Sequence, residues 1–231
     1  TNAGGGFDTS VAFTNVVQAW SPISPCYCVS MATNNTDQVI TNITMGSLNN
    51  TTDCITPLTG TQGVGVGTAN QFADFTGSVP APVVYIGLAQ NFSLGVGTCG
   101  GSVGTSASIF IDYNHDAVFG VGEEIYTNIN IANVPAVVSG SFTVPNGTPQ
   151  GVTRMRIVIQ SSWIGPVMPC GPYDYGETED YLVNIVSPSP HDPAITAITG
   201  AVGNCFSNNQ NIVLSVTNFG SNPIVVATNP I

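Results

Sequence analysis

The sequence is most informative over residues 108–123, which read SIFIDYNHDAVFGVGE. The first four residues are rich in β-branched and aromatic types, which favours a strand. The next twelve form a loop whose positions 1, 3, 5 and 12 carry oxygen-bearing side chains, namely Asp112, Asn114, Asp116 and Glu123. This is the ligand pattern of an EF-hand calcium loop, here without flanking helices. The stretch therefore predicts a strand that ends in a Ca²⁺ site.

The expected site would hold the hard Ca²⁺ ion with oxygen ligands. Short side chains at alternating positions can converge as the chain curls, the main-chain carbonyl of Val118 adds a ligand, and Glu123 completes the shell. Ala117 stands at position 6, where Gly normally allows a sharp turn, so we expect strain or weaker binding there. The alternative is an Asx-rich turn without metal. His115 is at a non-ligating position, and we expect it to face solvent.

Short segments with strand character surround this loop on both sides, separated by turn residues at intervals of roughly ten residues, which is typical of a sandwich or barrel. The expected strands cover residues 38–45, 63–75, 83–88, 91–97, 106–112, 123–131, 137–144, 152–161 and 179–186. We therefore predict that residues 25–187 form an all-β, antiparallel β-sandwich of the jelly-roll or Ig-like kind.

The two ends of the chain differ from this central region. Residues 1–24 are expected to form an arm that includes an alternating strand over residues 7–18. The proline-rich residues 188–193 predict a semi-rigid linker. Residues 194–231 offer three strands, at 194–199, 211–218 and 224–227, whereas an Ig-like module needs about seven. This part is expected to be a partial Ig-like β module, either truncated or completed by another chain.

The charge balance argues against two classes of partner. The chain has two Arg, no Lys and 13 acidic residues, for a net charge of −11. Nucleic acid and anionic membrane surfaces are bound through Lys and Arg, so both are poor partners. No apolar run approaches the roughly 18 residues of a membrane-spanning helix, and no membrane insertion is expected. The excess of carboxylates instead favours bound divalent metal.

Six cysteines indicate an oxidising, extracellular compartment, and no signal peptide is visible at Thr1, which fits a mature protein or a fragment. They are Cys26, Cys28, Cys54, Cys99, Cys170 and Cys205. We expect Cys99 to pair with Cys170, and Cys54 to pair with Cys26 or Cys28. Cys205 would then pair with whichever of these two remains, or with a cysteine outside this sequence.

Several motifs in the same order resemble those of the GEVED domain family. They are IFIDYNHD at 109–116 with GEE at 122–124, VP at 144–145, GVTRMRI at 151–157, and GETED at 176–180, while Tyr27-Cys28 and residues 43–49 look like the family's opening. The resemblance spans about residues 25–187. It implies a β-sandwich found in secreted, multidomain bacterial surface proteins, many from Bacteroidetes, which accompanies adhesins or hydrolases. Residues 192–218 resemble the first strands of an Ig-like adhesion repeat.

Two arginines and two glutamates are predicted to form structural ion pairs. Arg154 and Arg156 share one face of a strand, as do Glu177 and Glu179 on the next, because side chains alternate. Antiparallel pairing would bring the two sets together. The alternatives are that the arginines bind an anionic ligand, or that Asp180 or Glu179 reaches the calcium loop.

Catalysis is not expected. The two histidines lie in the loop and in the proline-rich linker, so neither suits a Ser-His-Asp triad. A glycosidase pair could come from Asp174, Glu177, Glu179 and Asp180, but the nearby arginines would neutralise them. The glycine-rich segment 63–67 lacks the Lys of a phosphate-binding loop.

The leading hypothesis is a structural or adhesive module of an extracellular surface protein, with itself or neighbouring domains as partners. Strand donation from residues 7–18 into a neighbour's residues 192–231 would build a filament. The alternative is a carbohydrate-binding accessory domain of a secreted hydrolase, in which Trp163, Tyr173 and Tyr175 contact glycans, although a packed Trp163 is the commoner case. A hydrolase is the weakest alternative.

Overall fold

The computed structural model describes residues 26–34, 36–55, 58–100, 104–189, 193–199, 213–218, 220 and 222–223. The predictions for residues 7–18 and 224–227, for His191 and for Cys205 lie outside these residues. The described chain is built of strands with one short 3₁₀ turn, Ser162–Ile164, which confirms the all-β prediction. None of its helices is long and apolar enough to span a membrane.

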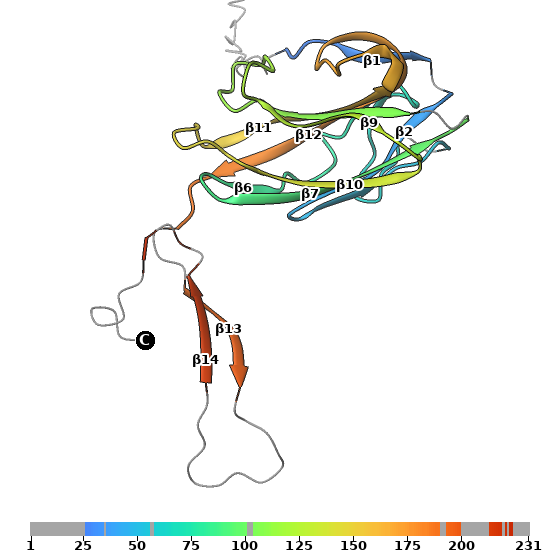
Figure 1. The fold of residues 1–231 in the computed structure, drawn as a ribbon. Coiled ribbons are helices and arrows are strands. Elements are labelled where there is room, and N and C mark those ends of the chain that lie inside the picture. Colours follow the sequence, from blue (N-terminus) through green and yellow to red (C-terminus); the bar gives the residue numbers. More distant parts are fainter. Residues whose placement is uncertain are drawn as a thin grey trace, which may run out of the picture.

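Two sheets pack face to face as a sandwich (Figure 1). The eight-stranded sheet has the order β4-β5-β12-β11-β8-β9, with β1 and β6 also paired to β12. Its strands are β1 (Ser30–Asn34), β4 (Val66–Thr68), β5 (Phe72–Asp74), β6 (Val83–Tyr85), β8 (Thr105–Ile111), β9 (Glu124–Ile131), β11 (Gly151–Ser161) and β12 (Gly171–Val186).

The four-stranded sheet has the order β10-β7-β2-β3. Its strands are β2 (Gln38–Met45), β3 (Leu48–Thr51), β7 (Ala89–Thr98) and β10 (Ala136–Thr143). A separate hairpin pairs β13 (Pro193–Thr199) with β14 (Val213–Asn218). The short strands β1 and β3 were not predicted from the sequence, and β12 begins at residue 171, eight residues before the predicted start at 179.

The main core lies between the sheets. Side chains at alternating positions face inward, as Met155, Ile157 and Ile159 do on β11. A second cluster covers the outer face of the large sheet and includes Phe110, Phe119, Val158 and Tyr173. Strand β8 is therefore buried at every position, because both of its faces are covered.

Strand β12 organises the large sheet. It pairs in antiparallel fashion with β11 and in parallel with β1, β5 and β6, so the sandwich is not purely antiparallel. Gly176 lies where β12 leaves β1 and joins β11, with φ of 139°. A Cβ at Gly176 would collide with the carbonyl oxygen of Ile159, so the first residue of the GETED motif has to be glycine.

The disulfides join Cys28 to Cys170 and Cys54 to Cys99, while Cys26 is free and exposed. The predicted pairing of Cys99 with Cys170 is wrong, and so is that of Cys54 with Cys26 or Cys28. Strand β1 pairs in parallel with the start of β12, which brings Cys28 beside Cys170. Strands β3 and β7 lie on either side of β2, and both run towards the start of β2. This arrangement brings Cys54 beside Cys99.

Candidate functional site

The predicted calcium loop connects β8 to β9. Its base is closed by the Ile111 N–H, which donates to the Glu123 carbonyl at 2.9 Å. Asp112 and Glu123 are buried, whereas Asn114 and Asp116 are exposed. The first and last positions of the ligand pattern are therefore buried, and the two middle positions face solvent.

The buried carboxylates of the loop accept hydrogen bonds from its own main chain. Asp112 accepts from the N–H groups of Asp116 at 3.3 Å and Ala117 at 3.0 Å. Glu123 accepts from Tyr113 at 2.8 Å and Asn114 at 3.3 Å with Oε1, and from Gly120 at 2.6 Å with Oε2. These bonds close the loop from inside, so its curled shape has a source independent of any ion.

The backbone conformation of the loop matches that of a calcium loop more closely than the arrangement of its side-chain oxygens does. Ala117 adopts the left-handed conformation, with φ of 67°, at the position where Gly is usual. The Asn114 amide donates to Asp116 Oδ2 at 2.8 Å, so these side chains contact each other. The described part of the chain contains no group of three or more His, Cys, Asp or Glu side chains arranged to hold a metal. Calcium binding therefore stays a prediction.

His115 lies in the same loop and also has a positive φ, of 62°. It was expected to face solvent, but it is half-buried and its Nε2 atom is covered.

The arginines bind Asp180 instead of the predicted Glu177 and Glu179. Arg156 donates through Nε to Asp180 Oδ1 at 2.7 Å and through Nη2 to Oδ2 at 2.8 Å. Arg154 adds a third bond to Oδ2, at 2.8 Å. Arg156 is opposite Asp180 in the β11–β12 register, whereas Glu179 is opposite Ile157. The two glutamates therefore point into the sandwich, away from both arginines.

This arginine cluster ties three segments to the outer face of the large sheet. Arg156 Nη1 donates to the carbonyl oxygens of Cys28 and Pro169, each at 2.8 Å. The Arg154 guanidinium lies 4.5 Å from the centre of the Tyr27 ring. The Tyr27 hydroxyl in turn donates to Asp112 Oδ2 at 2.6 Å, which links the cluster to the loop.

The environment of Tyr27 perturbs its ionisation. Burial, together with the hydrogen bond to Asp112, raises the pKa of Tyr27 to about 12. Tyr27 therefore stays a neutral donor to the Asp112 carboxylate over the physiological pH range. Asp180 contacts the loop only indirectly, and Glu179 faces the core, so neither is an outer ligand of the loop.

The two glutamates join the sheets. Glu177 Oε2 accepts from the Ile40 N–H on β2 at 2.8 Å. Glu179 contacts Thr52 and accepts from the Tyr181 hydroxyl at 2.9 Å. Thr52 and Tyr181 were not predicted as partners of the glutamates, and Asp180 was not predicted as the partner of the arginines. The sequence signal that could have distinguished Asp180 from Glu177 and Glu179 is the alternation of side chains along β12, which places Asp180 on the opposite face of the sheet.

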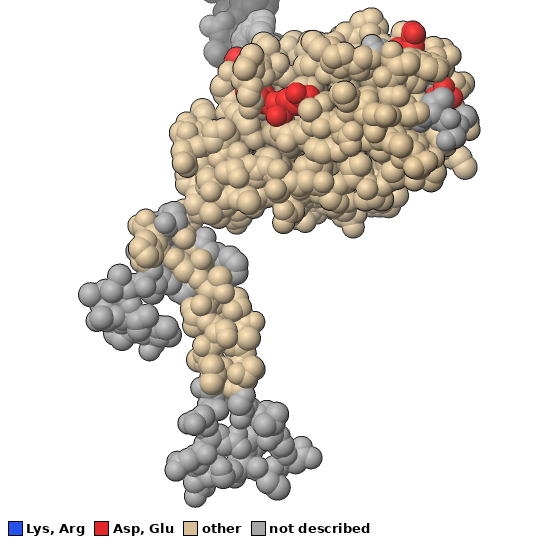
Figure 2. All heavy atoms as spheres, viewed as in Figure 1, with Lys and Arg blue, Asp and Glu red and all other residues tan. Residues whose placement is uncertain are grey.

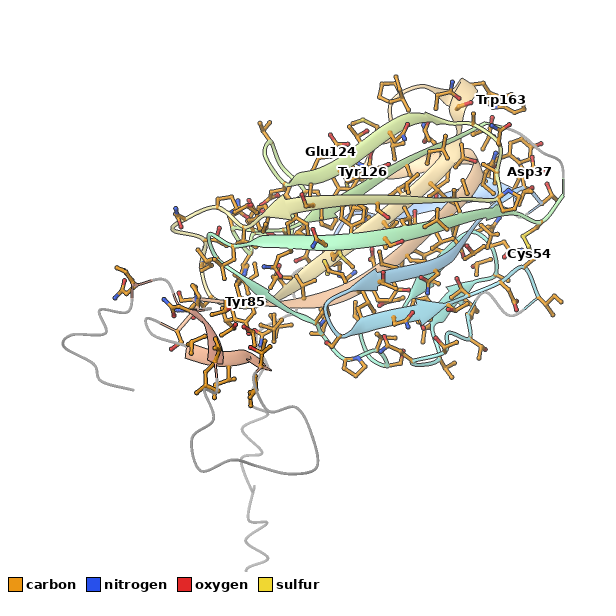
Figure 3. The ribbon with its side chains drawn as sticks, turned by 60° about the horizontal axis from the view of Figure 1, so that its bottom comes forward. Asp37, Cys54, Tyr85, Glu124, Tyr126 and Trp163 are labelled. Atoms are coloured by element: carbon orange, nitrogen blue, oxygen red, sulfur yellow. A yellow bond between two sulfur atoms is a disulfide. The ribbon has the colours of Figure 1, made fainter. Side chains whose placement is uncertain are left out.

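The aromatic residues proposed for glycan contact differ in their exposure to solvent. Trp163 is 68% exposed and lies at the edge of the sandwich (Figure 3). Its ring is edge-on to the ring of Tyr175, with 6.2 Å between the ring centres. Tyr173 is buried and its hydroxyl shares a 2.8 Å hydrogen bond with Thr178. The predicted ligand role of Tyr173 is therefore wrong, because its ring belongs to the outer core cluster.

The described surface includes a groove and a smaller hollow. A shallow groove of about 580 Å³ crosses the four-stranded sheet and is lined mainly by Ser, Thr, Asn and Gly. A smaller one of about 150 Å³ lies between Tyr27, Met31 and the two arginines. Neither is lined by a carboxylate, so neither offers a pair of acidic groups for acid–base chemistry.

Comparisons with known proteins agree with part of the sequence analysis. The family model of the GEVED domain matches residues 106–184. Among solved structures, the chain is similar to the CARDB domain of a Pyrococcus furiosus protein, determined in complex with di-metal ions. That likeness has 16% sequence identity and a TM-score of 0.32, and covers 46% of this chain and 86% of the other. No curated protein matches the chain.

Proposed function

We propose that this chain, whose residues 106–184 match the GEVED domain, is a non-catalytic structural module of an extracellular surface protein. The observation that carries the proposal is that the fold itself uses the motif carboxylates. Glu177, Glu179 and Asp180 are all 0% exposed. A carboxylate that binds substrate needs access to it, and these have none.

The surface and the disulfides support the same assignment. Few acidic side chains and no Lys or Arg are visible on the face shown in Figure 2, although the chain carries a net charge of −11. The two disulfides favour an oxidising compartment, as expected for a secreted protein.

The hairpin β13–β14 supports an assembly role. A bulge at Thr196 brings Ile195 and Ile198 onto one face with Val216 and Leu214, and all four are exposed. A two-stranded hairpin with an uncovered apolar face is marginally stable in water. We propose that the alternating segment 7–18 of a neighbouring copy pairs with the edge of this hairpin as an added strand, which would enlarge the sheet and extend a filament.

We also propose that the loop 112–123 binds Ca²⁺ through Asp112, Asn114, Asp116, the Val118 carbonyl and Glu123. The ligand spacing and the left-handed Ala117 support this assignment. Bound ion would stabilise the loop beyond what its main-chain hydrogen bonds achieve.

Adding Ca²⁺ to protein that has first been treated with a chelator is expected to raise the melting temperature of the protein. The reason is that a ligand present at a concentration one hundred times its Kd stabilises the folded state by about 2.7 kcal/mol. Asp116→Ala should abolish the response and leave the buried carboxylates in place. Asp174→Asn, exposed and outside the loop, is the matched control. Calorimetry with and without a chelator measures the shift, and an unchanged melting temperature in the wild type would show that the loop is closed by amides alone.

The second candidate function is glycan binding by an accessory domain of a secreted hydrolase. It is favoured by the exposed Trp163, whose ring could stack on a sugar with Tyr175 beside it. Glycan binding by Trp163 would not involve the β13–β14 hairpin.

One experiment separates the two candidates. We expect the wild-type chain to form oligomers that grow with concentration in sedimentation velocity and negative-stain images, and Leu214→Asp to abolish them by charging the hairpin face. Trp163→Ala should not change assembly. Ile129→Asp, a similarly exposed position on β9, controls for added charge. A monomeric wild type that is retained by a polysaccharide, with retention lost in Trp163→Ala, would favour glycan binding instead.

A further inference from the structure

Glu177 and Glu179 occupy successive inward positions on β12 and face the four-stranded sheet. Both side chains are 0% exposed. A buried carboxylate is stable as an anion only when cations or several donors compensate its charge. The surroundings of the pair therefore decide which form is present.

Compensating cations are absent from this region. The whole chain has two Arg and no Lys, and both arginines, Arg154 and Arg156, bind Asp180 on the opposite face. The strands of the facing sheet, β2, β3, β7 and β10, contain no ionisable side chain. No basic group of the described chain is thus available to either glutamate.

Hydrogen counting shows which oxygen holds a proton. The Thr52 hydroxyl oxygen lies 2.5 Å from the Ile40 carbonyl oxygen and 3.1 Å from Glu179 Oε1. A hydroxyl has one hydrogen, and a carbonyl can only accept. Thr52 therefore donates to Ile40, and the contact with Glu179 is a hydrogen bond only if Glu179 supplies the hydrogen.

The other oxygen of Glu179 is an acceptor. The Asn50 amide donates to the Tyr181 hydroxyl at 2.9 Å, and Tyr181 donates to Glu179 Oε2 at 2.9 Å. The chain of donors thus runs from Asn50 through Tyr181, Glu179 and Thr52 to the Ile40 carbonyl. Every link is satisfied with one added proton.

We propose that Glu179 is a buried proton-binding site, protonated in the folded protein, whose proton bridges β12 to the four-stranded sheet through Thr52. Its direct hydrogen bonds are to Thr52 and Tyr181, so loss of the proton would leave a charge in the core and remove the link to Thr52. Glu177 is the nearest like group, and its Oε1 has no hydrogen-bond partner among the described residues.

The ionisable groups around β12 agree with a neutral Glu179. Burial raises the pKa of Glu179 to about 8, and burial together with Glu179 raises the pKa of Glu177. Burial likewise raises the pKa values of Tyr181 and Tyr173. On the neighbouring elements, Arg154 and Arg156 of β11 and Asp74 of β5 lie on the outer face with Asp180, and Tyr85 of β6 is exposed.

The sign of the pH dependence follows. The folded-state pKa of Glu179 lies above the ordinary value of 4.5 for an unfolded chain. Its contribution to stability is therefore complete below about pH 4.5 and is lost as pH rises through about 8.

The test compares Glu179→Gln with the wild type between pH 5 and pH 9.5. Gln keeps a donor for Thr52 and an acceptor for Tyr181 but cannot ionise. We expect the wild-type melting temperature to fall towards alkaline pH, and the Glu179→Gln profile to be flatter and higher at pH 9. Glu124→Gln, exposed on β9, should follow the wild type. Equal slopes for Glu179→Gln and the wild type would overturn the proposal.

Infrared difference spectroscopy of Glu177→Gln tests the same proton with Glu179 in place, because Glu179 is then the buried glutamate of this pair that can still ionise. The carbonyl band of a protonated carboxylic acid should be present at pH 6 and lost by pH 9.5. If Glu179→Gln fails to fold, this measurement decides: absence of the band at pH 6 would show that Glu179 is ionised in the core.

Discussion

Asp180→Asn is expected to lower the free energy of unfolding by about 3–5 kcal/mol, because it leaves a buried guanidinium without a counter-charge. The side chains of Asp180 and Arg156 are 0% and 2% exposed, and Asp180 accepts three hydrogen bonds from the two arginines. The substitution keeps the size of the side chain and removes its charge. Urea unfolding followed by fluorescence measures the loss.

Two further variants locate the effect. Arg156→Met should cost more than Arg154→Met, since Arg154 is 18% exposed and makes one hydrogen bond to Asp180. Glu124→Gln, exposed on β9, should leave the unfolding midpoint unchanged. If Asp180→Asn lowered the free energy of unfolding by less than about 1 kcal/mol, the Asp180–Arg156 pair would contribute no more than a surface ion pair. That result would contradict its structural role.

Removal of the Cys28–Cys170 disulfide has the second large expected effect. Its cysteines are 142 residues apart, and the chain-entropy relation gives about 5 kcal/mol for closing such a loop. The bond also holds Cys28, whose carbonyl accepts from Arg156, against the large sheet. The double variant Cys28→Ser, Cys170→Ser should therefore lose about 4–5 kcal/mol in urea unfolding without reductant.

The second disulfide provides the comparison. Cys54 and Cys99 are 45 residues apart, so their removal should cost about 1 kcal/mol less on the same relation. Both measurements need a background in which Cys26 and Cys205 are Ser, so that no other cysteine exchanges with the disulfide under test. A larger loss for Cys54→Ser, Cys99→Ser than for the first pair would show that loop length does not govern these bonds.

Strand β12 explains how one acidic motif can serve two faces of a sheet. Within residues 176–180, Glu177 and Glu179 face the interior and contact β2 and the residue after β3, Thr52. Asp180 faces outward and binds both arginines. Successive residues of a strand point to opposite sides, so the motif joins sheet to sheet with its glutamates and sheet to loops with its aspartate.

Much of the fold was predictable from local patterns. Alternating and β-branched segments identified most strands, and the class is confirmed by the structure. The motifs around residues 109–116 and 176–180 pointed to the GEVED domain, whose model matches residues 106–184. The charge count also showed that two cations must serve many carboxylates.

The partners of those residues were not predictable in the same way. The predicted pairing of Arg154 and Arg156 with Glu177 and Glu179 failed because a shift of one residue in register moves a whole set of side chains to the other face. The predicted disulfides failed because cysteine spacing carries no information on which strands become neighbours.

By itself, the sequence determined that the chain is all-β, that an acidic loop with the residue spacing of a calcium loop follows one strand, and that cations are too few to neutralise its acids. Tertiary structure alone decided that Asp180 takes both arginines and that Glu179 is left in the core beside Thr52. The physical reason is distance along the chain. Patterns of period two are local, whereas the contact of Glu179 with Thr52 joins residues 127 apart and exists only once the two sheets have packed.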